Sequence, residues 1–231
     1  MKNILITAGG TREYIDDVRV MTNISSGKLG AQIALDVSQM ENTLVHFVHG
    51  VGSVLPESIG LANTSRITYY EVKTAQDAMD TIRMIILKEN IKVVIHSMAV
   101  SDFTFKREGN IKIKSNKPED LIEFMRKSIT PNPKIISHIK KWKPEVHLIG
   151  FKFEVGIPFE DLKALAEKSI EDNGCDLVIA NDKEEMKRMK EHVAHFIFSK
   201  NMSLEYGITG GMVFGKDDIS KYIVYFLKRI F

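Results

Sequence analysis

Cysteine is almost absent from this sequence, in which Cys175 is the single example among 231 residues. One cysteine excludes an internal disulfide framework and a metal site built on a cluster of thiolates. The seven histidines form no H-x-x-x-H or H-E-x-x-H pair, so we expect no zinc site held by protein side chains. Because a chain without disulfides fits a reducing compartment, we expect a cytoplasmic location.

Long apolar runs and an excess of one charge are also missing. The first apolar stretch is too short for a signal peptide, and no later run approaches the ~18–20 residues of a membrane span, so we expect no membrane partner. The 32 Lys and Arg residues alternate with 30 Asp and Glu residues, which gives no argument for nucleic-acid binding. With 44% hydrophobic residues and no visible repeat or linker, the sequence predicts a single globular domain over residues 1–231.

Short β-rich apolar runs alternate with longer amphipathic segments, which is typical of α/β proteins with a Rossmann-like, mainly parallel sheet flanked by helices. The expected strands are Asn3–Thr7, Thr43–Val48, Ile67–Glu71, Val93–Ser97, Val146–Lys152 and Asp176–Ala180, followed by a hairpin of His195–Ser199 with Ser203–Tyr206. The expected helices are Gly27–Met40 (capped by Ser25 or Ser26), Thr74–Glu89, Pro158–Asp172 and Ile219–Phe231. The apolar residues of Leu121–Arg126 suit either a strand or a short helix.

The alternation fails after the fourth strand, between Ser101 and Lys117. This segment holds little core material, and basic residues crowd it: Lys106, Arg107, Lys112, Lys114 and Lys117. A segment with few apolar contacts opens at low cost. We therefore predict a mobile basic flap over about 101–117.

Ligands of open α/β sheets bind beyond the carboxyl ends of the strands, where the strand order reverses. Four loops that carry glycine or polar residues follow expected strands: 8–28, 98–117, 151–154 and 181–182. Polar loops are also the default on any protein surface, so their position alone does not identify the site.

Asn23–Gly30 is the most informative segment of these loops. Its small residues let backbone amides approach an anion, and the helix that follows offers unpaired N–H groups, so phosphate is a candidate ligand and a capped helix start is the simpler alternative. Gly27-Lys28 lacks the first glycine and the Ser or Thr of a Walker loop. No G-x-G-x-x-G follows the first strand and no acidic residue ends the second, which disfavours a dehydrogenase.

Two further side chains are candidates with plain alternatives. Lys112 in the flap can meet the phosphates of a nucleotide, although a single lysine is more often a solvated surface charge. Asp102, just past a buried strand, can bind a ligand N–H or hydroxyl group, or else cap its own turn.

Six segments together carry a more specific signal, and they span nearly the whole chain. They are TAGGTREYIDDVRVMTNISSGKLG (7–30), SMAVSDF (97–103), KIK (112–114), TPNPKI (130–135), GFKFE (150–154) and DLVIAND (176–182). In order and spacing they resemble the phosphopantothenate-cysteine ligase family, also called phosphopantothenoylcysteine synthetase. In many bacteria this domain follows a flavin-dependent phosphopantothenoylcysteine decarboxylase. Since nothing precedes the first strand here, the resemblance implies the stand-alone ligase, with a separate decarboxylase as a candidate partner.

The resemblance implies a reaction of coenzyme A biosynthesis. The carboxylate of 4'-phosphopantothenate attacks the α-phosphate of CTP, which gives an acyl-cytidylate and pyrophosphate while Mg²⁺ screens the phosphates. The amine of L-cysteine then displaces CMP and forms the amide of 4'-phospho-N-pantothenoylcysteine. Animal relatives use ATP instead, and the TPNPKI segment favours CTP.

The resemblance also assigns roles to individual residues. Lys112 closes over the nucleotide and stabilises charge in the first step, and Asn23 holds the acyl intermediate for its reaction with cysteine. Arg19 reaches the substrate phosphate from a neighbouring subunit, which implies a homodimer, and Ala99 contacts the pantothenate arm. The nucleotide contacts are Gly9, Gly10, Ser25, Gly27, Gly30, Met98, Ala99, Asp102, Asn132, Pro133, Lys134, Ile135, Phe151, Lys168 and Asn181.

The sequence departs from the family pattern at a few matched positions. Gly10 replaces the proline of bacterial relatives, Met98 replaces an alanine, and Ser115 replaces the last lysine of KIKK. The helix before DLVIAND ends in 172–174 where a second lysine is expected. Two alternatives stay open, a non-catalytic nucleotide-binding regulatory protein of the same fold and an NAD(P)-dependent reductase. The presence of both Asn23 and Lys112 favours the ligase.

Overall fold

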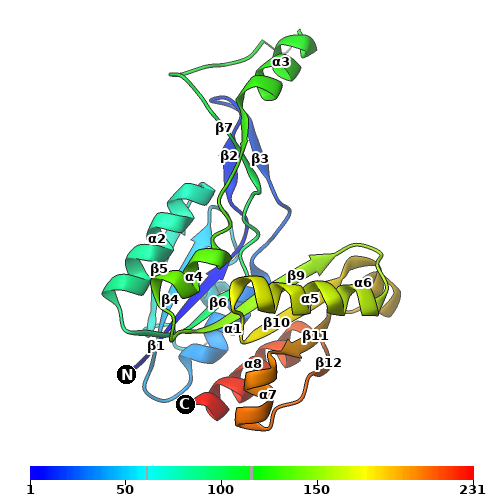
Figure 1. The fold of residues 1–231 in the computed structure, drawn as a ribbon. Coiled ribbons are helices and arrows are strands. Elements are labelled where there is room, and N and C mark those ends of the chain that lie inside the picture. The colour runs from blue at the N-terminus through cyan, green and yellow to red at the C-terminus, as the bar shows by residue number, and fades with distance from the viewer. Residues whose placement is uncertain (61, 115–116) are drawn as a thin grey trace.

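A single large sheet organises the molecule. The computed structural model describes residues 1–60, 62–114 and 117–231. Within these residues, eight strands form one sheet in the order β12-β11-β10-β9-β6-β1-β4-β5 (Figure 1). The strands are β1 (Lys2–Ala8), β4 (Thr43–Gly50), β5 (Ile67–Val72), β6 (Ile91–His96), β9 (His147–Glu154), β10 (Leu177–Asp182), β11 (Val193–Phe198) and β12 (Gly211–Phe214).

The strands from β5 to β10 in this sheet run parallel, and β11 and β12 extend it as antiparallel strands. Counted along the chain, the parallel strands lie in the order 3-2-1-4-5-6, which reverses between β1 and β6. This is the switch point at which doubly wound sheets bind their ligands. The predicted α/β fold with a mainly parallel sheet is confirmed.

Helices cover both faces of the sheet and bury a separate core on each (Figure 1). One face carries α1 (Lys28–Ser38), α7 (Lys200–Tyr206) and α8 (Lys216–Ile230), and the other carries α2 (Ala75–Lys88), α4 (Ile136–Trp142) and α5 (Phe159–Asn173). Along β1, Ile4 and Ile6 belong to the first core and Leu5 to the second, because successive side chains of a strand point to opposite faces. The short helices η1 (Pro56–Ser58) and α6 (Lys183–Met189) complete this body.

The helix caps follow the sequence at α2 but not at α1. Thr74 caps α2 by accepting a hydrogen bond from Asp77 N, and the Asp77 carboxylate accepts one from Thr74 N. The cap residue of α1 is Gly27, with φ +72° and no side-chain cap bond, and neither Ser25 nor Ser26 as expected; Ser26 Oγ accepts only a long hydrogen bond from Lys28 N (3.4 Å) at the start of the helix. A left-handed backbone favours glycine, so the chain enters α1 by a tight turn.

The predicted hairpin after β10 is half wrong. Its first strand exists as β11, but residues 203–206 lie in α7, where the Ser199 side chain accepts a hydrogen bond from Met202 N. Gly207 ends the helix with φ +60°, and β12 then returns to pair with β11. A serine cap and a glycine stop therefore outweigh the alternating pattern of the segment.

A narrow stalk rises from the carboxyl edge of the sheet (Figure 1). It consists of β2 (Arg12–Tyr14) paired with β3 (Val20–Thr22), β7 (Phe103–Phe105) paired with β8 (Ile129–Pro131), and α3 (Pro118–Ser128) at its tip. The ambiguous segment 121–126 is thus helical. The stalk leaves the sheet from the ends of β1 and β6, on either side of the switch point.

The described part of the predicted flap, 101–114 and 117, forms one side of this stalk. Its start is β7, and Lys106 N donates a hydrogen bond to Ser128 O (2.8 Å). The mobility of the flap stays a prediction, and Ser115 lies outside the described residues. In the part of the chain that the structure describes, no helix has the length and apolar character to cross a bilayer.

Candidate active site

Glycines hold the start of α1 directly against the end of β1. Gly9 and Gly27 both have positive φ, and a Cβ on Gly27 would lie 3.0 Å from Gly9 N. A Cβ on Gly30 would lie 2.6 Å from the Ala8 Cβ and 2.7 Å from the Ser97 Oγ. Only glycine permits such close approach, and it places the positive end of the α1 dipole at the switch point. This geometry suits an anion, as the segment 23–30 predicts.

The chain continues beyond β1 and β6 as a short pair of parallel segments. Gly10 and Ala99 form a parallel bridge, Ala99 N donates to Gly9 O (2.7 Å), and Thr11 N donates to Ala99 O (3.3 Å). A Cβ on Gly10 would lie 2.7 Å from Asn23 O, so glycine is required here too. Three predicted contacts, Gly9, Gly10 and Ala99, are therefore neighbours at the switch point.

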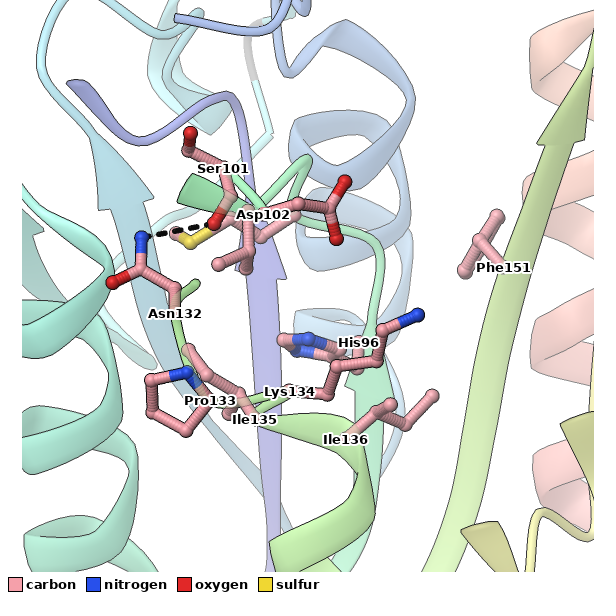
Figure 2. Close-up of a pocket in the computed structure, with 11 residues that line it drawn as sticks. His96, Ser101, Asp102, Asn132, Pro133, Lys134, Ile135, Ile136 and Phe151 are labelled. Carbon is pink, nitrogen blue, oxygen red and sulfur yellow. Dashed lines mark hydrogen bonds between the residues drawn. The ribbon is translucent and has the colours of Figure 1, made fainter. Parts of the chain in front are cut away.

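A cavity of about 220 Å³ lies beside this bridge, beyond the end of β6 and next to β9 (Figure 2). Asp102 and Lys134 point into it, and Phe151 of β9 lies across from them. It is smaller than the ~300–1,000 Å³ of a typical ligand pocket. The lining residues are His96, Met98, Val100, Ser101, Asp102, Asn132, Pro133, Lys134, Ile135, Ile136 and Phe151.

Hydrogen bonds to main-chain atoms fix the wall of the cavity. Asn132 donates from its side chain to Ser101 O (3.0 Å; Figure 2) and from its backbone to Asp102 O (2.8 Å). Ser101 N donates to the buried Thr11 Oγ1 (2.9 Å), and Asn23 Nδ2 donates to Val100 O (3.1 Å). The loops after β1, β6 and β8 are thus tied together, with the Asn23 side chain next to the cavity wall.

His96 forms the polar floor of the cavity at the end of β6. Its Nδ1 lies 3.0 Å from Thr7 Oγ1, which also accepts a hydrogen bond from Met98 N (3.2 Å). Burial lowers the pKa of His96 to about 4, because a charged imidazolium would lose its hydration. His96 is therefore neutral near pH 7 and offers a ring nitrogen without a charge.

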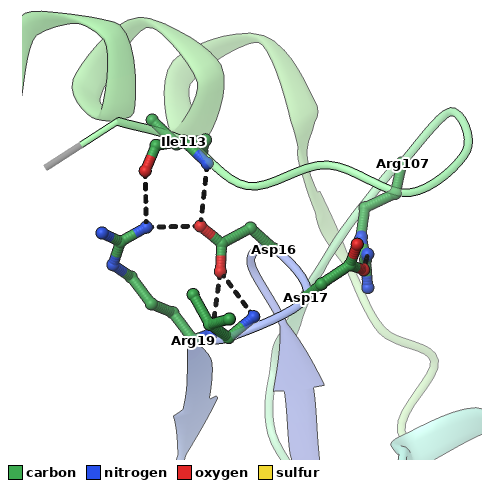
Figure 3. A network of polar contacts seen from close by, with 6 residues as sticks. Asp16, Asp17, Arg19, Arg107 and Ile113 are labelled. Carbon is green, nitrogen blue, oxygen red and sulfur yellow. Dashed lines mark hydrogen bonds and ion pairs between the residues drawn. The ribbon is translucent and has the colours of Figure 1, made fainter.

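Two predicted site residues, Arg19 and Lys112, lie in the stalk and not in the cavity. Arg19 forms an ion pair with the buried Asp16 and donates from Nη1 to Ile113 O (3.2 Å; Figure 3). Lys112 is exposed on the neighbouring segment. The structure thus groups Arg19 with the Lys112 segment, and it separates both from the cavity lining.

Two other predicted contacts lie elsewhere. Lys168 is exposed on α5, with its Nζ 3.6 Å from Asp172 Oδ2. Asn181 is buried in β10 and donates a hydrogen bond to Val193 O of β11. Ser25 lies in the loop two residues before the cap of α1. Of the four candidate loops, those after β1 and β6 meet at the switch point. The expected loop 151–154 is instead the last part of strand β9, from which Phe151 lines the cavity, and 181–182 are the end of β10, where Asn181 serves the sheet.

A second cavity of about 590 Å³ lies between α5 and the strands β11 and β12. Phe159, Lys163, His195 and Met212 are among its lining residues, and none of the predicted site residues is. Its larger size therefore does not make it the better candidate, because the convergent polar groups are at the switch point.

Sequence reasoning missed His96 and Ser101 as parts of the site. Both stand at or just past the end of a buried strand, which is the position that the switch-point rule singles out. The polar residue His96 at the end of the apolar run 91–95 was the available signal.

Comparison with known proteins identifies the family to which this geometry belongs. The model of the DNA/pantothenate metabolism flavoprotein C-terminal domain matches residues 1–209. The chain belongs to this family. The resemblance that the six motifs carry is thereby confirmed.

One curated relative aligns with most of the chain. The chain is 39% identical over 182 residues to the coenzyme A biosynthesis bifunctional protein CoaBC of Thermococcus kodakarensis, and the alignment covers 78% of this chain and 41% of that protein. The chain therefore spans about two fifths of the length of this curated relative.

Solved structures share the fold over the whole chain. The DNA/pantothenate metabolism flavoprotein from Streptococcus pneumoniae matches with a TM-score of 0.78 and 28% identity, covering 100% of both chains. A Cab2 mutant, solved in complex with phosphopantothenate-cysteine, matches with a TM-score of 0.73 and 18% identity, covering 99% of this chain and 87% of that one. At that identity, the Cab2 likeness concerns the fold.

Proposed function

We propose that this protein joins 4'-phosphopantothenate and L-cysteine in coenzyme A biosynthesis, as a CTP-dependent phosphopantothenate-cysteine ligase. The observation that carries the proposal is the switch-point cavity, whose lining comes, apart from His96 and Ile136, from three of the motifs, SMAVSDF, TPNPKI and GFKFE. The fold shared with a protein solved in complex with phosphopantothenate-cysteine supports it.

The reaction needs an activated carboxylate, because a carboxylate anion is a poor acyl donor. The substrate carboxylate oxygen bonds to the α-phosphorus of CTP, the bond to the β-phosphate oxygen breaks, and pyrophosphate leaves. The cysteine amine then bonds to the acyl carbon, the carbon–oxygen bond to CMP breaks, and the amine loses a proton. Phe151 and Asp102 suit a nucleotide base, which has an apolar face and N–H groups at its edge.

The N-terminus of α1 and Lys112 suit the phosphates of the nucleotide, and Asn23 suits the acyl group. The N-terminus of α1, built by Gly9, Gly27 and Gly30, offers backbone N–H groups to an anion. Lys112 supplies the cation for the first step once the stalk segment meets the nucleotide. Asn23, beside the cavity wall, supplies an amide N–H for the acyl carbonyl in the second step.

Mg²⁺ fits this site as a companion of the nucleotide. Among the described residues, no group of three or more His, Cys, Asp or Glu side chains lies together. Mg²⁺ commonly keeps several waters and binds through the substrate phosphates, so it would arrive with the nucleotide. The ion would neutralise phosphate charge there.

A homodimer is part of this proposal, because Arg19 and Lys112 stand apart from the cavity lining. The stalk exposes large apolar side chains that a second copy can cover: Val18, Val20, Phe103, Ile122 and Ile129. A stalk that reaches the cavity of a neighbouring copy would bring Arg19 to the substrate phosphate.

Pyrophosphate release tests the proposal directly. The purified chain is assayed with Mg²⁺, phosphopantothenate and cysteine, with CTP or ATP, and with each component omitted in turn. We expect release that requires phosphopantothenate and is faster with CTP. Faster release with ATP would overturn the choice of nucleotide, and no release from folded protein would overturn the ligase.

A matched pair of variants connects this activity with the cavity. Phe151→Ala should raise the KM for CTP about tenfold or more, since it removes the ring across from Asp102. Phe159→Ala removes a partly exposed ring outside this cavity and should leave the KM unchanged. Equal KM values in the two variants would show that the nucleotide binds elsewhere.

A further inference from the structure

The Asp16 carboxylate is the most densely bonded group of the stalk. The residue is fully buried, although it lies in a turn that joins two three-residue strands. Its Oδ1 accepts hydrogen bonds from Val18 N (2.9 Å) and Arg19 N (2.8 Å). Its Oδ2 accepts from Ile113 N (3.1 Å) and from the Arg19 guanidinium (Figure 3).

The two oxygens therefore have different tasks. Oδ1 closes the turn between β2 and β3, as aspartate commonly does. Oδ2 reaches a segment that is 97 positions away in sequence, and Arg19 strengthens this link because its Nη1 also donates to Ile113 O (3.2 Å). One carboxylate thus joins the turn, the guanidinium of Arg19 and the backbone of residue 113.

The segment that Oδ2 holds carries Lys112. Both neighbours of Lys112 are fixed to the same turn, Ile113 through Asp16 and Ile111 through a hydrogen bond from Asp17 N to its carbonyl oxygen (2.9 Å). With the backbone held on both sides, Lys112 can explore only its side-chain rotamers. The entropy lost in fixing a backbone is about 1–2 kcal/mol per residue, so this anchoring favours one placement of the amine.

The charges around Asp16 keep it ionised. Burial raises its pKa, but the backbone N–H groups of Val18, Ile113 and Arg19 and the charge of Arg19 outweigh burial, and the pKa lies below its ordinary value. Nearby, Asp17 forms an ion pair with Arg107, and this pair is more exposed. The link is therefore intact at neutral pH.

We propose that Asp16 is a positioning residue of the ligase, because its Oδ2 clamps the Lys112 segment and Arg19 into one unit. This inference rests on the proposed function for its catalytic part. Asp16 itself is enclosed and touches no substrate. It acts on the first step, through Lys112, and on phosphopantothenate binding, through Arg19, but not on the step that depends on Asn23.

The variant Asp16→Asn tests the hydrogen bonds of Oδ2 to Ile113 and Arg19 separately from the turn bonds of Oδ1. The amide oxygen can keep the two turn bonds of Oδ1, and the amide NH2 then faces Ile113 N–H and Arg19 as a donor facing donors. In the opposite orientation the turn bonds are lost instead. The matched control is Asp17→Asn, which removes one negative charge from the same turn but keeps the backbone bond to Ile111 and every bond of Asp16.

The first readout is independent of activity. We expect hydrogen exchange over 111–113 and trypsin cleavage after Lys112 to be about tenfold faster or more in Asp16→Asn, because a hydrogen bond to a charged group is lost. Asp17→Asn should stay within about twofold of the wild type. Because the new amide can also turn its oxygen toward Ile113 N, the clamp is overturned when exchange over 111–113 equals that of the wild type both in Asp16→Asn and in Arg19→Ala. If Asp16→Asn does not fold, Arg19→Ala, which removes both bonds of Nη1, must show the loosening.

The second readout separates positioning from general damage. In Asp16→Asn, pyrophosphate formation should slow about tenfold or more and the KM for phosphopantothenate should rise, whereas the reaction of preformed acyl-cytidylate with cysteine should keep its rate. An equal loss in both half-reactions would show a merely structural role and overturn the proposal. A wild type that releases no pyrophosphate would overturn the ligase function, and the exchange rates alone would then decide whether Asp16 clamps this segment.

Discussion

The switch-point cavity and the stalk are built in opposite ways. The cavity lies against a sheet with a hydrophobic core on each face, and close glycine contacts and main-chain hydrogen bonds set its shape. The stalk has strands of three residues, exposed apolar side chains and a buried carboxylate as its main link. A rigid binding edge is thus combined with an arm that has little core of its own.

This difference divides the proposed chemistry between the two regions. Residues that would recognise the nucleotide by shape, such as Met98 and Phe151, belong to the rigid edge. The cations that would act on phosphates, Arg19 and Lys112, belong to the arm. Shape recognition needs fixed walls, whereas a cation that closes over a substrate can stand on a separate arm from which its long side chain reaches the phosphates.

The largest effect should come from removing one catalytic group in each region. Lys112→Gln removes the cation of the arm, and we expect acyl-cytidylate formation to fall about 10²–10³-fold. Asn23→Asp places a carboxylate oxygen where an N–H donates to Val100 O, so acyl-cytidylate should form and accumulate. Mass spectrometry of the trapped intermediate distinguishes the two. The same product pattern in both variants would refute the division between edge and arm.

The next effect concerns the buried floor of the cavity. The pKa of His96 is about 4 in the folded chain, against an ordinary value of 6.5. Between pH 4 and pH 6.5, His96 is therefore protonated in the unfolded chain and neutral in the folded chain. The stability from a neutral, buried His96 is complete above pH 6.5 and is lost as the pH falls toward 4, by about 3 kcal/mol in all. Urea unfolding from pH 7.5 to 4 should show this slope.

The variant His96→Gln is the control for this slope, since glutamine does not titrate. The difference between its unfolding free energy and that of the wild type should depend on pH only between about 6.5 and 4. A difference that is constant over this range would show that His96 is hydrated and that the floor of the cavity is open to water.

The smallest effect tests the close packing of the edge. Gly30→Val should destabilise the fold by about 2 kcal/mol, because a Cβ there would lie 2.6 Å from the Ala8 Cβ, which has no flexible atoms to move aside. Gly211→Val on β12 meets open space and should change stability by no more than ~0.5 kcal/mol. Denaturant midpoints measure both, and similar shifts would contradict a tightly packed edge.

Local patterns predict the elements of the sheet well. The runs at β1, β4, β5 and β6 are apolar and short, and the capping residues Thr74 and Asp77 begin α2 where expected. The same reasoning fails at 203–206, because alternation over four residues is weaker evidence than a cap at Ser199 and a stop at Gly207. It also finds no order in 101–117, because β7 depends on its partner β8.

Sequence alone determined the fold class, the family and most of the cavity, because strand periodicity, glycine positions and ordered motifs are local and additive signals. Tertiary structure decided which candidates meet. It brought residues 98–102, 132–135 and 151 together, left Lys168 and Asn181 apart, and placed Arg19 and Lys112 on one arm. It also decided that His96 is neutral and that Asp16 links segments 97 positions apart, since burial and long-range hydrogen bonds exist only in the folded chain.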